Sequence, residues 1–310
     1  MSDAADVSRT RAWLMAARPH TLPAAASPVI VGTGLAYGEG VFAPITALAA
    51  LLGAALIQVG TNFANDYYDA KKGTDTDERE GFTRVTQSGL IPPARVFRAT
   101  YATFALAILV GVYLVWVGGL PIVVVGLASV AAGLLYTGGP YPYGYYGLGD
   151  AFVFVFFGVV AVTGSYYVQA ASSVAGVPLW IPAGTVPVEA LVASLPMAAL
   201  ITNILVVNNV RDIETDRKAG KYTLAVYVGY AGSRVEFLAL LVLAYLVPFW
   251  FLAGGRGYWV LLPLASLPLA VGVARTVLTE TSGEALNPAL SRAGRLAAVY
   301  AVLFAVGLAL

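Results

Sequence analysis

The sequence contains no cysteine and only one histidine, and 11% of its 310 residues are charged. The absence of cysteine excludes disulfides and thiol chemistry, and a single histidine, His20, excludes a site built from several imidazoles. The formal net charge of +1 gives no indication of a nucleic-acid partner, because such partners favour strongly basic chains. Soluble domains contain about 25% charged residues. The low charge content therefore argues against a soluble globular protein.

Hydrophobic residues make up 59% of the chain and occur in long runs. A membrane-spanning helix needs about 20 mostly apolar residues. We therefore predict an all-α, polytopic membrane protein, a single domain over residues 1–310 in which nine transmembrane helices form one bundle. The predicted spans cover residues 21–38, 44–64, 97–117, 120–137, 149–170, 188–208, 236–254, 258–277 and 293–310. A Gly-Gly-Leu-Pro turn between the third and fourth spans predicts a helical hairpin.

The lysines and arginines predict how this bundle is oriented, since cytoplasmic loops are enriched in them. With the N-terminus in the cytoplasm, every lysine and arginine except Arg256 falls on the cytoplasmic side. Residues 1–20 then form a cytoplasmic tail with an amphipathic start, and they contain no apolar core of a signal peptide. An odd number of spans places the C-terminus outside. We predict a multi-pass protein of the cell (cytoplasmic) membrane, surrounded by membrane lipid.

Charged residues are missing from the middle of every predicted span. Ion pumps and proton-coupled transporters usually need such groups at membrane depth, which leaves a multipass transporter as a remote alternative. The acidic residues gather instead at the cytoplasmic ends of two spans. We therefore predict an active site on the cytoplasmic side of the bundle.

The first acidic cluster follows the second span and places oxygen atoms in a column. Its sequence is Asn62-Phe-Ala-Asn65-Asp66-Tyr-Tyr-Asp69. On a helix, positions 62, 66 and 69 share one face, and positions 65 and 69 lie one turn apart. Amide and carboxylate oxygens are ligands for hard divalent cations, and the coordination of Mg²⁺ is often completed by substrate phosphates.

The second acidic cluster follows the sixth span and repeats this pattern. Its sequence is Asn208-Asn209-Val-Arg211-Asp212-Ile-Glu214-Thr-Asp216, in which positions 208, 212 and 216 share one helical face. Ordinary polar helix ends explain one such run, but two columns of asparagine and aspartate on the same membrane side favour a metal site. We predict Mg²⁺ as the cofactor, with ligands from both clusters: Asn62, Asn65, Asp66, Asp69, Asn208, Asn209, Asp212 and Asp216.

Basic residues next to the two clusters predict an anionic substrate. Carboxylates alone repel a diphosphate, whereas Mg²⁺ bridges the two, and metal and basic groups together stabilise a diphosphate as it leaves. The candidate diphosphate ligands are Lys72, Arg84, Gln87, Lys218 and Lys221. The alternative for the basic residues is the ordinary excess of positive charge in cytoplasmic loops. For Arg84, the polar residues that follow it favour binding.

Several separate stretches resemble one family of membrane enzymes, and together they span nearly the whole chain. They are Arg18-Pro-His20-Thr-Leu-Pro23, the first cluster with Gly73-Thr-Asp75, Arg79 and Arg84-Val-Thr-Gln87-Ser-Gly89, Tyr136-Thr-Gly-Gly-Pro140, Tyr145-Tyr-Gly-Leu-Gly149-Asp150, Phe156-Phe-Gly158, and the second cluster with Gly220-Lys221-Tyr-Thr-Leu. On these residues the chain resembles the UbiA superfamily of intramembrane aromatic prenyltransferases. Within it, the chain is most similar to the branch that acts on 1,4-dihydroxy-2-naphthoate.

The resemblance implies nine helices, two Asp-rich motifs, and transfer of a polyprenyl group from a polyprenyl diphosphate. The implied acceptor is 1,4-dihydroxy-2-naphthoate, which loses carbon dioxide while diphosphate is released, giving demethylmenaquinone in menaquinone biosynthesis. A different aromatic acceptor, such as 4-hydroxybenzoate or homogentisate, is the alternative within the family. The implied catalytic aspartates are Asp66, Asp69, Asp212 and Asp216.

The remaining candidates each have two interpretations. Tyr136, Tyr145 and Tyr146 suit an aromatic wall that binds the acceptor and the prenyl cation, or an aromatic belt at the membrane interface. Asp150 is a candidate catalytic residue that positions or deprotonates an acceptor hydroxyl, or an acid stabilised by the dipole of a helix N-terminus. His20 is either a substrate-binding base or a hydrogen-bonded residue at a helix start.

Overall fold

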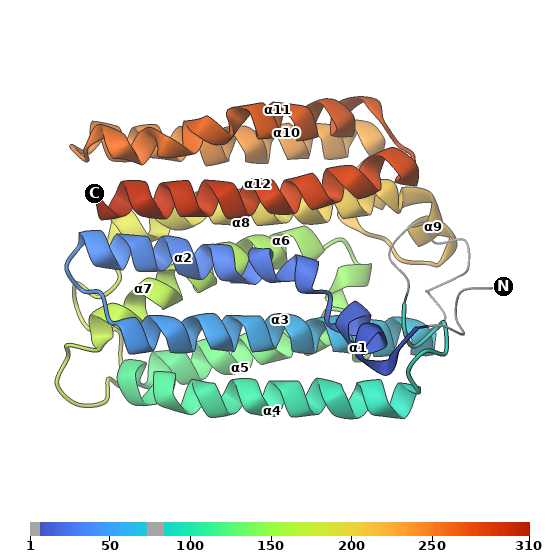
Figure 1. The fold of residues 1–310 in the computed structure, drawn as a ribbon, viewed down its shortest axis with the longest axis horizontal. Helices are drawn as coiled ribbons and strands as arrows, with labels where there is room; N and C mark the ends of the chain where they lie inside the picture. The colour runs from blue at the N-terminus through green and yellow to red at the C-terminus, as the bar shows by residue number, and fades with distance from the viewer. Residues whose placement is uncertain (1–6, 73–83) are drawn as a thin grey trace.

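The spanning helices run side by side along the long axis of the molecule (Figure 1). The computed structural model describes residues 7–72 and 84–310. Within these residues every regular element is helical, apart from an isolated bridge that pairs Tyr146 with Tyr222. Three residues of the motifs quoted above, Gly73, Asp75 and Arg79, lie outside the described residues.

The helices follow one another along the chain, and the longer connections precede α4 and α8. The first half of the chain forms α1 (Arg9–Ala17), η2 (Pro19–Thr21), α2 (Leu22–Gly38), α3 (Pro44–Lys72), α4 (Pro93–Gly118), α5 (Leu120–Leu135) and η3 (Tyr143–Tyr145). The middle forms α6 (Gly149–Val153), the π-helix η4 (Phe154–Val160) and α7 (Ala161–Ala171) without a break. The second half forms α8 (Val188–Arg211), α9 (Ile213–Lys218), α10 (Leu224–Ala253), η5 (Tyr258–Ser266), α11 (Leu267–Thr279) and α12 (Gly283–Ala309).

Among the described residues, seven helical stretches are long and apolar enough to cross a membrane. They are α3, α4, the α6–η4–α7 stretch, α8, α10, the η5–α11 stretch and α12. The helix α5 is apolar but shorter, and α2 has 17 residues. Helices also lie over each of the nine intervals predicted as spans. The chain is therefore an all-helical, multi-pass membrane protein.

Several helices extend beyond the predicted spans at the end of the bundle that holds the acidic clusters. Helix α3 continues to Lys72, where the prediction ended at residue 64. Helices α10 and α12 begin at Leu224 and Gly283, where the predictions began at residues 236 and 293. The helices are longer than the predicted spans because hydropathy detects only the part of a helix that lies in the apolar layer.

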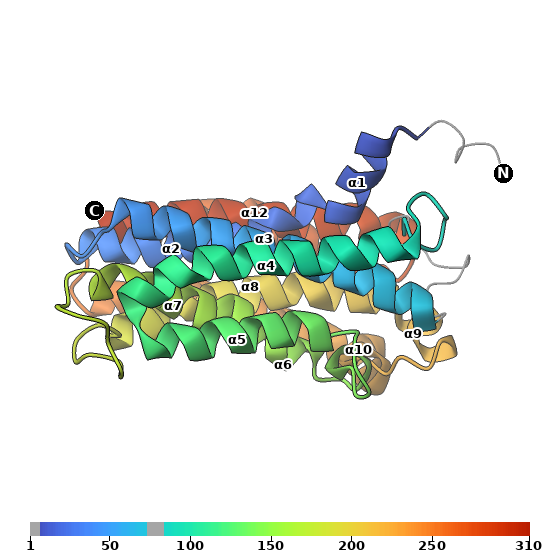
Figure 2. The ribbon, with the colours of Figure 1, turned by 90° about the horizontal axis from the view of Figure 1, so that it is seen from below.

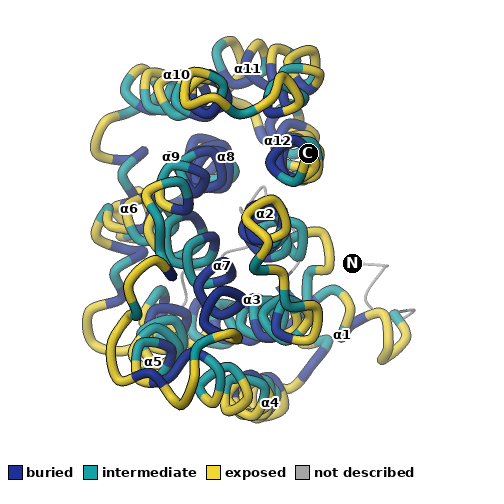
Figure 3. The backbone as a smooth tube through the Cα atoms, turned by 90° about the vertical axis from the view of Figure 1, so that its left-hand side faces the viewer, coloured by how far each residue is buried: buried dark blue, intermediate teal, exposed yellow. Residues whose placement is uncertain are grey.

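The bundle is layered when viewed along its axis (Figure 3). Helices α10 and α11 lie on one side, α3, α4 and α5 on the other, and α2, α7, α8 and α12 between them. The predicted hairpin is confirmed, because α4 and α5 are joined at Gly119, whose φ of 67° favours glycine. Helix α8 is the most buried of the spanning helices. Helix α1 projects from the end of the bundle (Figure 2), where it packs on α3.

Small residues allow the central helices to approach closely, as is common in membranes. A Cβ atom at Gly158 would lie 2.1 Å from the Cβ of Ala198, where η4 crosses α8. A Cβ atom at Gly34 would lie 2.5 Å from the carbonyl oxygen of Ala305, where α2 packs on α12. The place of α8, and of the second acidic cluster at its end, depends on such contacts.

Substitution of Gly158 by alanine tests this packing. The added methyl group overlaps Ala198, so we expect Gly158→Ala to lose about 1–3 kcal/mol of stability, which a lower Tm in detergent would show. Gly272→Ala in α11 is the control, because no atom lies within 4 Å of its Cβ position. Equal Tm values for the two variants would contradict the close contact between η4 and α8.

Candidate active site

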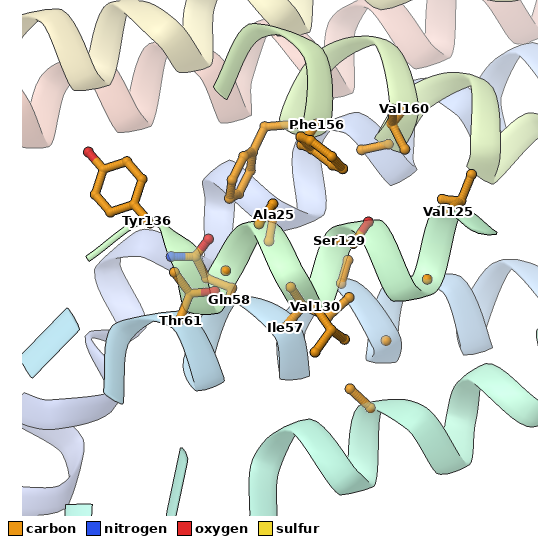
Figure 4. Close-up of a pocket in the computed structure, with 18 of the residues that line it drawn as sticks. Ala25, Ile57, Gln58, Thr61, Val125, Ser129, Val130, Tyr136, Phe156 and Val160 are labelled. Atoms are coloured by element: carbon orange, nitrogen blue, oxygen red, sulfur yellow. The ribbon is translucent and has the colours of Figure 1, made fainter. Parts of the chain in front are cut away.

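A cavity of about 580 Å³ lies among α3, α4, α5 and the α6–η4–α7 stretch. Its lining on α3 extends from Ala50 to Asp69, a helical distance of about 28 Å. Apolar side chains form most of the wall, and Figure 4 shows Ile57, Val130 and Phe156 on different helices around this space. One end is polar and includes Arg18, Asn65, Asp69, Arg84, Asn208 and Lys221. The cavity suits an elongated ligand with an apolar body and a charged head.

The aspartates of the first cluster contact the loop that follows α3. Asp66 is 1% exposed, and its Oδ2 accepts hydrogen bonds from the backbone N–H of Thr86, at 3.1 Å, and from its hydroxyl. The Nη2 atom of Arg84 donates to Oδ2 of Asp69 at 3.1 Å. Arg18 lies with its Nη2 4.0 Å from Oδ1 of Asp66, and its φ of 51° turns the chain between α1 and η2. Such strained backbone is typical of functional sites.

Tyr145 connects the first cluster to the second. Its hydroxyl donates to Oδ1 of Asp69 at 2.7 Å. The Nζ atoms of Lys72 and Lys221 lie 4.8 and 5.9 Å from the centroid of its ring, distances that suit cation–π contacts. Lys221 also forms an ion pair with Asp216 at 3.3 Å. The two predicted clusters therefore lie at the same end of the bundle and are joined through Tyr145.

The second cluster does not form one continuous helix. Helix α8 ends at Arg211, and Asp212 has a φ of −97° between α8 and α9. This break lets two sequence neighbours meet, so Nε and Nη2 of Arg211 donate to the two carboxylate oxygens of Asp212, both at 2.7 Å. The same guanidinium donates to the amide oxygens of Asn208 and, on α12, Asn287, both at 2.8 Å.

The asparagines predicted as metal ligands have different surroundings. Asn62 donates from Nδ2 to two groups in the segment between α1 and α2, both at 2.9 Å, and thereby anchors that segment to α3. Asn65 accepts a hydrogen bond from the hydroxyl of Thr137 at 3.0 Å. Oδ1 of Asn209 is buried and has no hydrogen-bond partner among the described residues. Among these asparagines, the Oδ1 atom of Asn209 is thus the one with no hydrogen bond in the part of the chain that the structure describes.

Four other candidates are exposed and are not among the residues that line the cavity: His20, Gln87, Tyr146 and Lys218. Desolvation of the ring and the positive charge of Arg18 lower the pKa of His20 and so disfavour its charged form. Lys72 donates to the carbonyl oxygen of Thr137 in addition to its contact with the Tyr145 ring. The roles of these five residues in substrate binding stay predictions.

Asp150 and Tyr136 lie together beside the cavity. Asp150 is 5% exposed in the first turn of α6, and its Oδ2 has no hydrogen-bond partner in residues 7–72 and 84–310. Tyr136 lies next to the start of this helix, since a Cβ atom built at Gly149 would be in van der Waals contact with the Tyr136 hydroxyl, at 3.5 Å. Tyr136 (Figure 4) is the first of four neighbouring rings that line the cavity: Tyr136, Tyr143, Phe152 and Phe156. The centroids of successive rings lie 5.3, 4.1 and 6.0 Å apart. An aromatic wall is thus present, but Tyr145 and Tyr146 do not belong to this run.

Among the residues that contact the aspartates of the clusters, the sequence analysis did not select Arg18, Thr86 and Arg211. Arg18 and Arg211 lie inside quoted motifs, so their positions in those motifs were an available signal. Thr86 also lies inside a quoted motif, but its contact with Asp66 depends on the fold of the loop.

Buried acids and bases at one end of an apolar cavity, within a membrane bundle, define an intramembrane enzyme for amphipathic substrates. The UbiA prenyltransferase family matches residues 25–309, and the chain belongs to this family. It is thus a prenyltransferase.

Relatives match along nearly the whole chain. The chain is 40% identical to the 1,4-dihydroxy-2-naphthoate octaprenyltransferase of Escherichia coli (strain K12), over 97% of this chain and 96% of that one. It is 38% identical to the protein of the same name from Mycobacterium tuberculosis, over 96% of each chain.

Solved structures share the fold. The apo structure of a UbiA homolog from Aeropyrum pernix K1 has a TM-score of 0.70 at 13% identity and covers 92% of this chain and 96% of that one. A UbiA homolog from Archaeoglobus fulgidus, bound to DMAPP and Mg²⁺, has a TM-score of 0.58 at 16% identity, over 95% and 99%. At these identities the likeness concerns the fold alone.

The donor atoms at the polar end fit Mg²⁺ when it arrives with phosphate. Among the described residues, no group of three acidic or histidine side chains could hold a metal ion alone. The available donors are oxygens, and the buried Oδ1 of Asn209 lacks a hydrogen-bond partner in this part of the chain. Mg²⁺ usually binds through one or two carboxylates, waters and substrate phosphates, so this donor set suits a metal shared with a diphosphate.

Substitution of Tyr145 by phenylalanine keeps the ring and removes the hydroxyl that donates to Asp69. A hydrogen bond to a charged group contributes about 1.5–3 kcal/mol, so we expect prenyl transfer to slow by roughly ten- to a hundredfold. Tyr146→Phe is the control, because Tyr146 is 53% exposed. Steady-state turnover of both variants in one detergent measures the difference, and equal rates would remove Tyr145 from the organisation of the first cluster.

Proposed function

We propose that this chain transfers a polyprenyl group from a polyprenyl diphosphate to 1,4-dihydroxy-2-naphthoate, with loss of carbon dioxide and diphosphate. The product is demethylmenaquinone, and the pathway is menaquinone biosynthesis. The observation that most supports the reaction is the meeting of two acidic clusters at the charged end of a long apolar cavity. The two bacterial relatives named as 1,4-dihydroxy-2-naphthoate octaprenyltransferases support the choice of acceptor.

The diphosphate binds at the polar end of the cavity. Arg84 and Lys221 line this end, and Lys72 lies beside them over the Tyr145 ring. These three cations offset the charge that the leaving group gains as the bond to carbon breaks. Lys218 and Gln87, exposed at the same end, complete the set predicted from the sequence.

Mg²⁺ binds between the two clusters. Its carboxylate ligands are Asp66, Asp69, Asp212 and Asp216, with amide oxygens from Asn65, Asn208 and Asn209, while Asn62 orients the first cluster through its contacts with the α1–α2 segment. When bound, the metal supplies positive charge to the leaving diphosphate. The Mg²⁺ in the structure of the Archaeoglobus homolog supports the choice of metal.

The prenyl tail and the acceptor occupy different parts of the cavity. Ile108, Val112 and Leu127 line it and are 51%, 62% and 64% exposed, so the cavity opens between α4 and α5 toward lipid. A long tail extends through this opening. The acceptor ring lies against the aromatic wall, where Asp150 accepts the proton of an acceptor hydroxyl and makes the ring more nucleophilic.

We further propose nine spans, an N-terminus in the cytoplasm, a C-terminus outside, and a site at the cytoplasmic face of the cell membrane. The opposite positions of α1 and the C-terminus support an odd number of spans (Figure 1). Arg256 supports the orientation, because it pairs with Glu39 and donates to the carbonyl of Leu308 at the end away from the clusters. The remaining basic residues lie in segments assigned to the cytoplasm.

Product analysis tests the acceptor. Purified protein, supplied with Mg²⁺, 1,4-dihydroxy-2-naphthoate and a mixture of prenyl diphosphates, should form a prenylated naphthalene product that has lost carbon dioxide, identified by mass spectrometry. If product forms with 4-hydroxybenzoate or homogentisate and not with 1,4-dihydroxy-2-naphthoate, the proposed acceptor is wrong. Solute flux in proteoliposomes without diphosphate release would favour a transporter.

Metal removal and two substitutions test the site. EDTA should stop turnover and added Mg²⁺ should restore it. Asp66→Ala and Asp212→Ala should abolish turnover at saturating Mg²⁺, because each removes a carboxylate ligand. Glu214→Ala is the matched control within the second motif, since the Glu214 side chain is 61% exposed. Near-normal activity of either aspartate variant would exclude that residue from the ligand set.

A further inference from the structure

Arg211 is buried against the oxygens of the second cluster. Its side chain is 2% exposed, and Nε and Nη2 contact both carboxylate oxygens of Asp212 at 2.7 Å. Nη2 and Nη1 also donate to Asn208 and Asn287 at 2.8 Å. A guanidinium that donates to both oxygens of a carboxylate forms one of the strongest ion pairs in proteins. The second cluster therefore already holds a cation that belongs to the chain.

The first cluster also has cations of the chain beside it, but their contacts are longer. Arg18 lies 4.0 Å from Asp66, which accepts its hydrogen bonds from the neutral donors of Thr86, and Arg84 lies 3.1 Å from Asp69. Arg84 also lines the cavity, where a substrate phosphate can reach it. The pair of Arg211 and Asp212 does not contribute to the cavity lining among the described residues. A divalent ion at Asp212 must therefore displace a buried guanidinium of like charge.

We propose that Arg211 is a positioning residue that makes metal binding at the second cluster depend on the diphosphate. This inference rests on the proposed metal site. Without substrate, Arg211 neutralises Asp212 and disfavours Mg²⁺ there. Arg211 is connected to the cavity through Asn208, which lines it and accepts a hydrogen bond from Nη2 at 2.8 Å. A diphosphate at this part of the lining offers the guanidinium a second anion that matches the planar fork, which frees the carboxylate oxygens for the metal. Because linkage is reciprocal, each ligand then raises the affinity for the other.

A purely structural role predicts the opposite response to substitution. Through Asn287, Arg211 also ties the end of α8 to α12. If this tie were its only role, removal of Arg211 would leave metal affinity unchanged or reduce it. If Arg211 competes with the metal, its removal strengthens metal binding in the absence of diphosphate.

Mn²⁺ binding to the full-length protein in detergent, without any diphosphate, separates the two roles. Electron paramagnetic resonance of free Mn²⁺ gives the affinity. We expect Arg211→Gln to bind Mn²⁺ about tenfold more tightly than the wild type, a size typical of coupling between sites. Asp212→Asn in the same chain should abolish this gain. Arg217→Gln is the control, because the Arg217 side chain is 49% exposed and pairs with Glu214.

Arg211→Lys is a second variant in case Arg211→Gln fails to fold. Lysine keeps the positive charge but cannot contact both carboxylate oxygens of Asp212 as the guanidinium does. We therefore expect its affinity for Mn²⁺ to lie between those of the wild type and Arg211→Gln. Unchanged or weaker Mn²⁺ binding in both Arg211 variants overturns the proposal. Failure of the proposed metal site has a different signature. In that case Mn²⁺ binding with inorganic pyrophosphate present is the same in Asp66→Asn, Asp212→Asn and wild-type protein.

Discussion

The neutralisation of buried carboxylates at one end of an apolar bundle is the constraint on which this structure depends. Asp66, Asp69, Asp212 and Asp216 are all buried. A charge taken out of water is tolerated only when it is paired or hydrogen-bonded. Each of these acids meets that condition through a different segment: the loop after α3, the turn at Tyr145, the end of α8 and the stretch after α9. The polar end can be assembled only if these segments converge.

The membrane helices provide that convergence. Helix α8 is held in the centre by close contacts between small residues, such as that of Gly158 with Ala198, so its end is fixed relative to α2, α7 and α12. Helix α3 extends beyond the apolar layer and presents its aspartates to the loop that follows. Tyr145 then lies between two lysines and an aspartate that come from both halves of the chain. Rigid apolar packing thus supports a site made of irregular segments.

Much of the fold could be predicted from the sequence, because the length and hydropathy of a spanning helix are local properties. The helical intervals, the hairpin and the two acidic helix ends follow from them. Side-chain partners could not be predicted in this way. Helical spacing treats Arg211 and Asp212 as neighbours that face apart, yet the break between α8 and α9 turns them toward each other. The tyrosine-rich segment has no regular period, so its sequence could not assign Tyr145 to the acidic clusters and Tyr143 to the cavity.

The exposed rim of the cavity has a consequence for the concentration of prenyl ligand that fills the cavity. Ile108, Val112 and Leu127 are exposed apolar residues of the cavity lining, and in the proposed arrangement they face the bilayer and not the aqueous phase. An isoprenoid ligand that enters there is drawn from a two-dimensional pool, so the quantity that governs saturation is its mole fraction among lipids. The bulk concentration of prenyl substrate that half-saturates the protein therefore changes with the amount of lipid or detergent present. This holds even when the protein and its affinity for the substrate are the same.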